Sequence, residues 1–181
     1  MSKSTDRSVV LLIDDEPDIV QIIELWLADT YEVRTATSGE AGLDALESTV
    51  DVVLLDRRMP GLSGDDVLTR IRDRADTYQV ALVTATDPDF DLIDLDFDTF
   101  VMKPLDEATV IGTVERLLAR TTYDTSVQER YTVAETRALL EKTKTERELA
   151  TSDRYQELIE RLTTLDELVT TEATELSREE V

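Results

Sequence analysis

The feature that most constrains the fold of this chain is a set of apolar runs that end abruptly in charged residues. In chain order they are residues 9–13 before Asp14 and Asp15, residues 52–55 before Asp56, and residues 100–102 before Lys103. Short continuous apolar runs are typical of parallel strands that are buried on both faces. Ligands bind beyond the carboxyl ends of such strands, so we expect the three acids and the amine to share one cleft.

Five apolar runs alternate with helical patterns along the first part of the chain. The expected strands are residues 9–13, 31–35, 50–55, 80–84 and 99–102. The expected helices run from Pro17 to about Asp29, follow the N-caps Ser38 and Ser63, and extend from about Asp106 to Arg120. This (βα)5 pattern predicts an α/β fold with a parallel, doubly wound sheet and right-handed crossovers.

One crossover has a weak helical pattern. In residues 87–98, acids alternate with apolar residues more than they follow a helical period. We therefore expect at most a short or distorted helix between the fourth and fifth strands.

The character of the sequence changes after residue 120, where strand-like runs stop. Apolar residues recur at helical spacing in two groups: Val127, Tyr131, Ala134 and Ala138, and then Tyr155, Leu158, Leu162, Leu165 and Val169. Ser152 or Asp153 can cap the second helix. We expect one domain at residues 1–120 and a helical domain at residues 121–181, formed as a hairpin or, as the alternative, as a dimerising coiled coil.

The composition excludes several classes of function. The chain has 41 acidic and 19 basic residues, which gives a net charge of -22. This charge disfavours broad electrostatic contact with DNA or anionic lipid. It has no Cys and no His, which excludes thiol nucleophiles, disulfides, imidazole bases and the usual zinc ligands. This acidic, Lys-poor composition resembles that of cytoplasmic proteins of halophilic archaea. No apolar signal segment or membrane span is visible, so we expect a cytoplasmic protein.

The charged residues at the strand ends suit phosphoryl chemistry with a divalent cation. Carboxylates of Asp14, Asp15 and Asp56 that converge would repel one another unless a cation neutralised them. Mg2+ binds oxygen ligands, commonly one or two carboxylates together with waters and a phosphate oxygen. Lys103 offers a positive charge for a phosphoryl oxygen, and Thr84, which closes the fourth strand, offers a hydroxyl.

These residues resemble the motifs of one family. Asp14-Asp15, then Asp56-x-x-Met59-Pro60-x-x-x-Gly64, then Thr84-Ala85 and finally Lys103-Pro104 are similar to the receiver domain of two-component response regulators, which the CheY protein exemplifies. The resemblance extends over residues 9–120. It implies a flavodoxin-like sheet of strand order 2-1-3-4-5.

The same resemblance implies a role for each site residue. Asp56 would be the phosphoacceptor. The Mg2+ ligands would be Asp15 directly, Asp14 mostly through water, and the main-chain carbonyl of Arg58. Thr84 and Lys103 would bind phosphoryl oxygens, and Phe100 would be the aromatic switch. The donor would be a sensor histidine kinase or a small phosphodonor, since the chain itself has no His. Such a protein is a phosphoacceptor in signalling and not an enzyme with its own substrate.

The helical part resembles a second family, and its role is more open. Tyr123-Asp124 and the run from Ala150 to Tyr155 resemble the HalX domain that follows receivers in halophilic archaea. This implies transcriptional regulation, through a homodimer or a downstream protein, with direct DNA binding disfavoured by charge. The acidic segment before the fifth strand lacks the usual Gly-Ala, which puts the standard receiver signalling surface in doubt.

Two alternatives to phosphoacceptor signalling follow from the same residues. One is an adaptor that acts without phosphorylation and retains the acidic pocket. The other is an aspartyl-phosphate hydrolase, which is disfavoured because Arg58 stands where that chemistry needs a second acid, two residues after Asp56.

Overall fold

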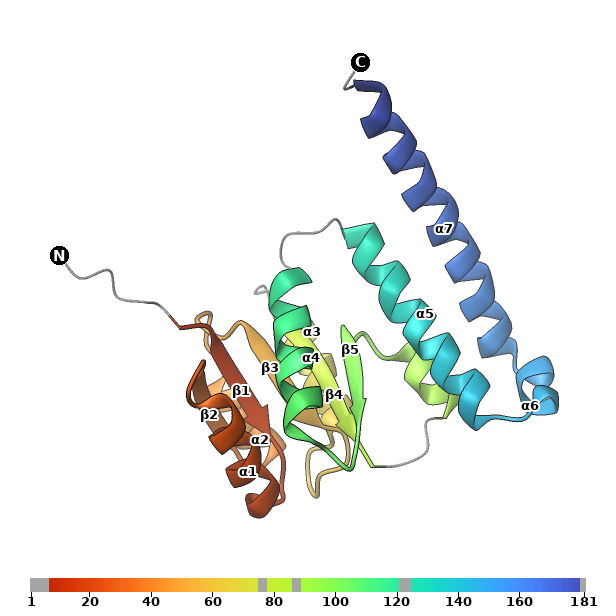
Figure 1. Cartoon of the computed structure of the whole chain (residues 1–181). Helices are drawn as coiled ribbons and strands as arrows, with labels where there is room; N and C mark the ends of the chain where they lie inside the picture. Colours follow the sequence, from red (N-terminus) through yellow and green to blue (C-terminus); the bar gives the residue numbers. More distant parts are fainter. Residues whose placement is uncertain (1–6, 75–77, 86–88, 121–124, 180–181) are drawn as a thin grey trace. The chain divides into compact units, whose positions relative to one another are not determined.

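The structure, a computed structural model, contains one five-stranded parallel sheet (Figure 1). It describes residues 7–74, 78–85, 89–120 and 125–179, with side chains described between 7 and 170. The strands are β1 (Val9–Ile13), β2 (Glu32–Ala36), β3 (Val52–Asp56), β4 (Gln79–Thr84) and β5 (Thr99–Met102). They pair in the order β2-β1-β3-β4-β5 with every pair parallel, as expected for a flavodoxin-like fold.

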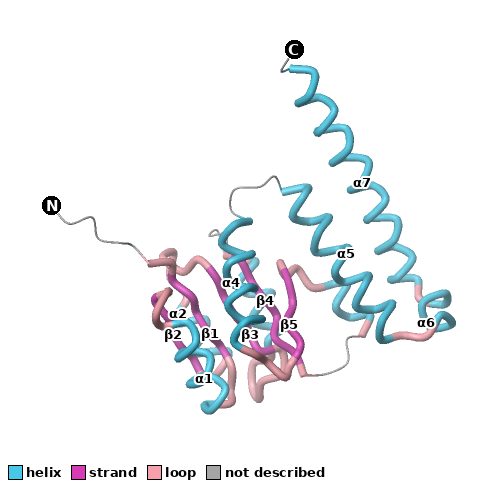
Figure 2. The backbone as a smooth tube through the Cα atoms, viewed as in Figure 1, coloured by secondary structure: helices cyan, strands magenta, loops and turns pink. Residues whose placement is uncertain are grey.

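Helices cover both faces of this sheet (Figure 2). They are α1 (Pro17–Leu27), α2 (Gly39–Ala45), α3 (Gly64–Arg72) and α4 (Glu107–Arg120). Contacts between α1 and α4, and between α2 and α3, place one pair on each face. The caps at Ser38 and Ser63 are confirmed, because each side chain accepts a hydrogen bond from the amide three residues later.

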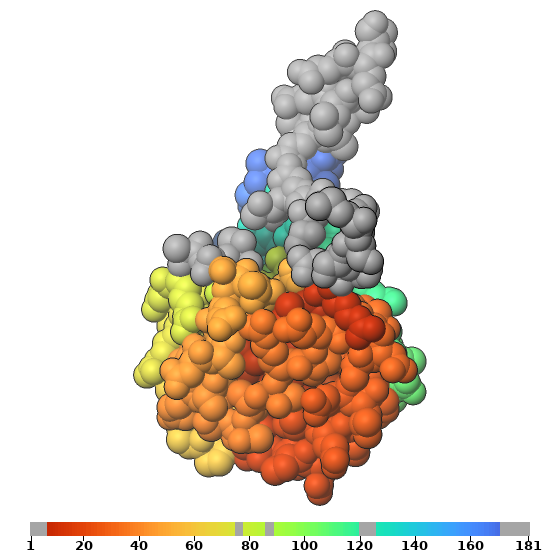
Figure 3. Space-filling model, turned by 90° about the vertical axis from the view of Figure 1, so that its left-hand side faces the viewer, coloured from red at the N-terminus to blue at the C-terminus, as the bar shows by residue number. Residues whose placement is uncertain are grey.

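The core of the sheet unit lies on both sides of the apolar strands. Val10, Leu12, Val52 and Leu54 are no more than 2% exposed and pack with apolar side chains of α1 and α4. Leu11, the residue between the first two, is also fully buried. A strand with successive side chains buried must be covered on both faces, which explains the unbroken apolar runs. Figure 3 views this unit from its β2 edge, where the surface is formed by N-terminal residues.

The fourth crossover holds a 3-10 helix, η1 (Phe90–Asp94), so the prediction of a short or distorted helix is confirmed. Residues 87 and 88 of that segment lie outside the described residues. By its contacts the chain divides into two compact units, and this segment belongs to the second. The sheet unit comprises residues 1–86 and 96–121, and the helical unit comprises residues 87–95 and 122–181.

The helical unit contains α5 (Thr125–Thr143), α6 (Glu146–Thr151) and α7 (Asp153–Glu179) in addition to η1. Helices α5 and α7 pack against each other within one chain. The predicted face of α7 is confirmed for Tyr155, Leu158, Leu162 and Leu165, which are all buried, whereas Val169 is only partly buried. Ser152 caps α7 by accepting a hydrogen bond from the Tyr155 amide at 3.2 Å. Tyr123 and Asp124 lie outside the described residues.

The predicted buried face of α5 is wrong for three of its four residues, whereas the fourth, Ala134, is partly buried and packs against the core of the helical unit. Val127 and Tyr131 are 38% and 43% exposed and Ala138 is also exposed, whereas Val133, Thr136 and Leu140 are buried. The true face has the same helical spacing but is rotated around the helix. It includes a polar residue, because the Thr136 hydroxyl donates to the Thr132 carbonyl at 2.9 Å and so can be buried.

Helix α6 was not expected from the apolar pattern. It begins with a capping box in which the Thr145 side chain accepts from the Glu148 amide and the Glu148 carboxylate accepts from the Thr145 amide. The sequence signal is Thr-x-x-Glu, which predicts a helix start on its own. No helix among the described residues has the length and apolar character of a membrane span.

Candidate functional site

A cluster of three carboxylates lies at the carboxyl ends of two neighbouring strands. Asp14 and Asp15 follow β1, and Asp56 is the last residue of β3. One ligand oxygen from each lies within 4.8 Å of the others. Asp14 and Asp56 are only 1% and 5% exposed, so these are not ordinary solvated surface acids. The parallel pairing of β1 with β3 brings the acids together, as the sequence predicts.

Lys103 lies in the same cluster and contacts three carboxylates at once. Its ammonium nitrogen Nζ is 2.9 Å from Asp56 Oδ1, 3.0 Å from Asp14 Oδ2 and 3.1 Å from Glu16 Oε1. An ammonium group has three donors, so each can be directed to one acid. The Lys103 amide donates to the Thr84 carbonyl at 2.8 Å, which holds the end of β5 beside the end of β4.

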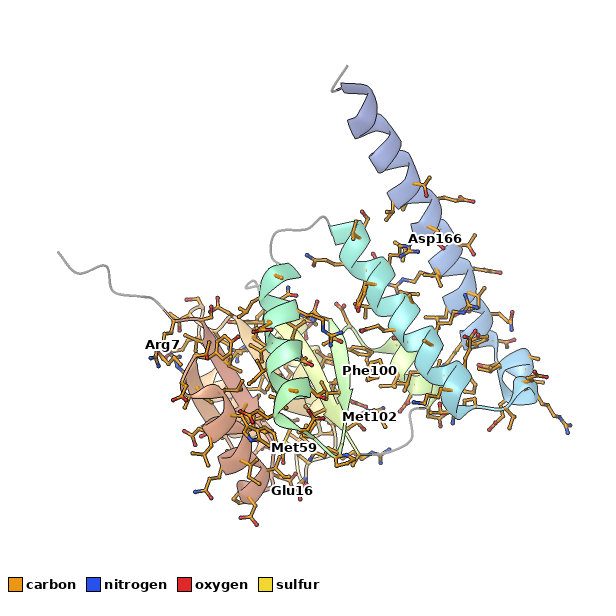
Figure 4. All side chains as sticks on the ribbon, in the orientation of Figure 1. Arg7, Glu16, Met59, Phe100, Met102 and Asp166 are labelled. Carbon is orange, nitrogen blue, oxygen red and sulfur yellow. The ribbon has the colours of Figure 1, made fainter. Side chains whose placement is uncertain are left out.

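Glu16 is the site residue that sequence reasoning missed. It precedes α1, its side chain is 60% exposed, and its amide donates to Asp14 Oδ1 at 2.9 Å. Figure 4 shows Glu16 and Met59 at the same end of the sheet, on the loops that follow β1 and β3. The only sequence signal was a third consecutive acid after β1, and an exposed acid near a helix start is common.

Burial and nearby charge make the Asp56 anion unfavourable. Burial raises the pKa of Asp56 above its ordinary value, and the charge of Asp14 raises it further. Lys103 and the Arg58 amide lower the pKa, but they do not outweigh these two effects. Burial alone would lower the pKa of Lys103, but its hydrogen bonds to Asp56, Asp14 and Glu16 outweigh burial and raise it. The Lys103 amine is therefore always charged. A second cation would further stabilise the carboxylate anions.

The loop after Asp56 is shaped by close backbone contact. The Arg58 amide donates to Asp56 Oδ2 at 3.0 Å, and the Gly64 amide donates to the Arg57 carbonyl at 2.9 Å. A Cβ at Gly64 would lie 2.3 Å from the Asp56 carbonyl oxygen, so only glycine fits there. Gly61 has a φ of 79°, in the left-handed region. These two glycines fold the loop back beneath Asp56.

Thr84 and Phe100 lie on the last two strands. Thr84 ends β4 and is 1% exposed. Phe100, on β5, is partly buried, and its ring meets Phe97 edge to face with centroids 6.2 Å apart. Arg58, whose carbonyl is the expected third metal ligand, is an exposed residue. The switching and ligand roles of these three residues stay predictions.

The residues present fit a magnesium ion. Magnesium prefers carboxylate and carbonyl oxygens, and the cluster offers three converging carboxylates of which two are buried. Burial, and to a smaller extent the charge of Asp14, raises the pKa of Asp56 and so disfavours its anion. A hard divalent cation compensates this negative charge without a proton.

Comparisons with known proteins agree with this geometry. The model of the response regulator receiver domain matches residues 10–115, and that of the HalX domain matches residues 119–181. A candidate transcriptional regulator of Haloferax volcanii is 43% identical over 136 residues, which are 75% of this chain and 23% of that protein. The response regulator SaeR of Staphylococcus epidermidis is 32% identical over 115 residues, 61% of this chain and 50% of that protein.

Solved structures show the same fold. A response regulator receiver domain protein from Clostridium thermocellum is 30% identical with a TM-score of 0.57, covering 63% of this chain and 96% of that one. The BeF3-activated DrrB receiver domain is 26% identical with a TM-score of 0.58, covering 63% and 99%. The chain spans half or less of the length of both curated relatives. It belongs to the response regulator receiver domain family and carries a HalX domain behind the receiver.

Proposed function

We propose that this protein accepts a phosphoryl group on Asp56 from a sensor histidine kinase and uses it as a conformational signal. The observation that carries the proposal is the convergence of Lys103 and two further carboxylates on one buried strand-end aspartate. The receiver domain would comprise residues 1–120 and the output domain residues 121–181.

The chemistry is an in-line transfer that needs positioning and charge more than covalent help. A carboxylate oxygen of Asp56 forms the new bond to phosphorus while the bond from phosphorus to the donor imidazole nitrogen breaks. The donor comes from another protein, because this chain has no His. Lys103 and the Thr84 hydroxyl would then hold phosphoryl oxygens.

The ligands of the cation would be the carboxylates of Asp14, Asp15 and Asp56 with the main-chain carbonyl of Arg58. Bound Mg2+ supplies positive charge to the transferring phosphoryl oxygens. Lys103 complements it from the β5 side, and its raised pKa keeps the amine charged.

The output proposal is regulation of transcription through the C-terminal helices. It is supported by the HalX match and by the name of the Haloferax volcanii relative. Residues 121–181 hold 8 basic and 15 acidic residues, so we propose that the helices act on a protein partner or a second copy and not on DNA.

The test is labelling of the purified chain by acetyl phosphate with Mg2+, read by intact mass. We expect a single phosphoryl group on the wild type, none on Asp56→Asn, and full labelling of the matched control Asp44→Asn, an exposed acid on α2. Circular dichroism checks that both variants are folded. An unlabelled but folded wild type that also shows no Mg2+ response would favour the phosphorylation-independent adaptor, and undiminished labelling of Asp56→Asn would refute the assignment.

A further inference from the structure

The loop after Asp56 begins with a cation that is almost completely buried. Arg57 is 4% exposed, and among the described residues it is the only Lys or Arg that the fold buries to this extent. Its guanidinium group makes a two-point contact with Asp65, in which Nε is 2.9 Å from Oδ1 and Nη2 is 3.1 Å from Oδ2. Removing a guanidinium group from water costs free energy, and the proposed phosphoryl transfer gives this one no role.

The main chain of Arg57 is held as firmly as its side chain. Its amide donates to the Val83 carbonyl of β4 at 2.8 Å, and its carbonyl accepts from the Gly64 amide at 2.9 Å. A Cβ on Gly64 would lie 2.6 Å from the Arg57 Cα, so the start of α3 packs directly on this residue. Asp65 is the next residue of α3. Arg57 is therefore fixed to β4 by its main chain, and to the first turn of α3 by its main chain and its side chain.

Arg58, the residue that follows, carries the groups that this attachment orients. Its amide donates to Asp56 Oδ2 at 3.0 Å, and its carbonyl is the proposed third protein ligand of the cation. Residues 58–63 form no helix or strand, so no regular hydrogen-bond ladder holds them. The planar peptide unit between Arg57 and Arg58 turns as a whole about the single bonds on either side of it. The contact with Asp65 provides a fixed point immediately before that unit.

We propose that the Arg57–Asp65 pair is a positioning device for the phosphoacceptor site, and that it acts through the main chain of Arg58. The inference rests on the proposed function and adds two residues to its site. By holding Arg57 against α3, the pair keeps the Arg58 amide directed at Asp56 and the Arg58 carbonyl available to the cation. Magnesium demands near-ideal octahedral geometry, so a rotation of this carbonyl weakens its binding.

An apolar pair would fill the same space without fixing a direction. The planar guanidinium and the carboxylate meet through two parallel hydrogen bonds, which define the orientation of both groups. Replacing both partners of a buried ion pair by uncharged residues is often neutral for stability, whereas removing one partner leaves the other charge unpaired. The Asp65 side chain is 37% exposed, so an amide in its place still reaches water. Exchange of both residues therefore separates positioning from stability.

The first experiment compares two double variants of the full chain, each of which removes one positive and one negative charge. Arg57→Met with Asp65→Asn removes the positioning pair. Arg34→Met with Glu47→Gln, the matched control, removes an ion pair of 2.9 Å that involves the edge strand β2. Isothermal titration calorimetry in constant monovalent salt gives the dissociation constant of Mg2+. We expect it to rise about tenfold in the first variant, as for outer-shell partners of other metal sites, and to stay at the wild-type value in the control.

Melting temperatures without Mg2+ show which variants are folded. Equal Mg2+ affinities of the wild type and the folded Arg57→Met, Asp65→Asn protein would overturn the inference.

Arg57→Lys separates direction from charge, and it keeps the inference testable if the first double variant does not fold. Lysine keeps the positive charge near Asp65 but lacks the planar fork of the guanidinium group. We expect Mg2+ affinity between those of the wild type and the double variant. Wild-type affinity of a folded Arg57→Lys protein would mean that charge alone suffices, and the positioning role would be wrong.

The Arg58 amide provides a readout that needs no metal. In heteronuclear magnetic resonance spectra of the Mg2+-free protein, the hydrogen bond to Asp56 moves this amide proton downfield. We expect an upfield change and faster exchange with water when the Arg57–Asp65 pair is removed, and no change in the Arg34 control. An Arg58 amide with wild-type shift and exchange in the folded variant would contradict the proposed action through the main chain.

The outcomes separate this inference from the function on which it rests. Labelling of Asp56 by acetyl phosphate in the wild type, with equal Mg2+ affinities of all variants, would overturn the positioning device and leave the phosphoacceptor intact. A folded wild type that is not labelled and does not bind Mg2+ would overturn both.

Discussion

The ammonium nitrogen of Lys103 lies 3.1 Å from Glu16 Oε1, although the two residues are 87 positions apart in the sequence. Its other two acceptors, Asp14 and Asp56, are almost completely buried, whereas the Glu16 side chain is 60% exposed. When a phosphoryl oxygen takes one of the three Lys103 donors, Glu16 is the acid that can return to water at least cost. Glu16 therefore competes with the phosphoryl group for Lys103.

Glu16→Gln should accelerate labelling by acetyl phosphate by up to about fivefold, the range of a solvated ion pair. The change removes a competing acceptor charge and also one negative charge that repels the anionic donor. Initial labelling rates measure the effect. Glu24→Gln, an exposed acid on α1, is the matched control and should label at the wild-type rate. A slower Glu16→Gln protein would mean that Glu16 assists the transfer.

Magnesium should raise the melting temperature of the wild type. A ligand at one hundred times its dissociation constant stabilises by about 2.7 kcal/mol, which corresponds to about 5–10 °C in a chain of this size. Asp15→Asn, which removes one carboxylate of the cluster, should respond less, and Asp18→Asn should respond as the wild type does. The melts belong in high, constant monovalent salt so that screening is the same throughout. Superimposable wild-type melts with and without Mg2+ would exclude the metal site.

Without Mg2+, Asp56→Asn should become progressively more stable than the wild type as the pH rises above about 4, the ordinary pKa of the unfolded carboxyl. Burial raises the pKa of Asp56 above its ordinary value of 3.8, so the folded protein holds this proton more tightly than the unfolded chain. That stabilisation is complete below the unfolded pKa and is lost as the pH rises through the folded pKa. Urea unfolding followed by the fluorescence of Trp26, the single tryptophan, measures it in the sheet unit. A difference that is independent of pH would refute the assigned cause.

The corrected face of α5 predicts unequal effects of two identical substitutions. Leu140→Ala removes a fully buried side chain from the core of the helical unit and should destabilise it by about 2–5 kcal/mol. Leu168→Ala, on α7 with its side chain 48% exposed, should change stability by about 0.5 kcal/mol or less. Thermal unfolding followed by far-ultraviolet circular dichroism compares them. Equal losses would indicate that Leu168 is buried in solution, as in a dimer.

The phosphorylated full-length chain should not bind duplex DNA more tightly than about 1 μM, because phosphate neutralisation requires a basic surface. The helical domain has a net charge of -7, and the whole chain one of -22. Fluorescence anisotropy of labelled duplex DNA at low salt, with beryllofluoride and Mg2+, is the measurement. Micromolar or tighter binding that disappears when residues 121–181 are removed would identify the tail as a DNA-binding domain.

The elements and most of the site could be predicted from the sequence because both depend on local pattern. Apolar runs predict buried strands. A parallel sheet places the carboxyl ends of its strands at the same end of the sheet, so Asp14, Asp56 and Lys103 lie close together whatever the arrangement of the helices. The N-caps Ser38 and Ser63 are local for the same reason, since each bonds within one turn.

Only the tertiary structure decided which surfaces those elements share. The contact of Glu16 with Lys103 and the packing of Phe90 among α5 and α7 join residues that no local period connects. The face of α5 was ambiguous because Thr and Ala suit either a core or a surface, and burial of Thr136 depends on a hydrogen bond within its own helix. Local sequence determines which residues follow the end of a strand and which side chains share one face of a helix. Which other element covers that face depends on the packing of the whole chain.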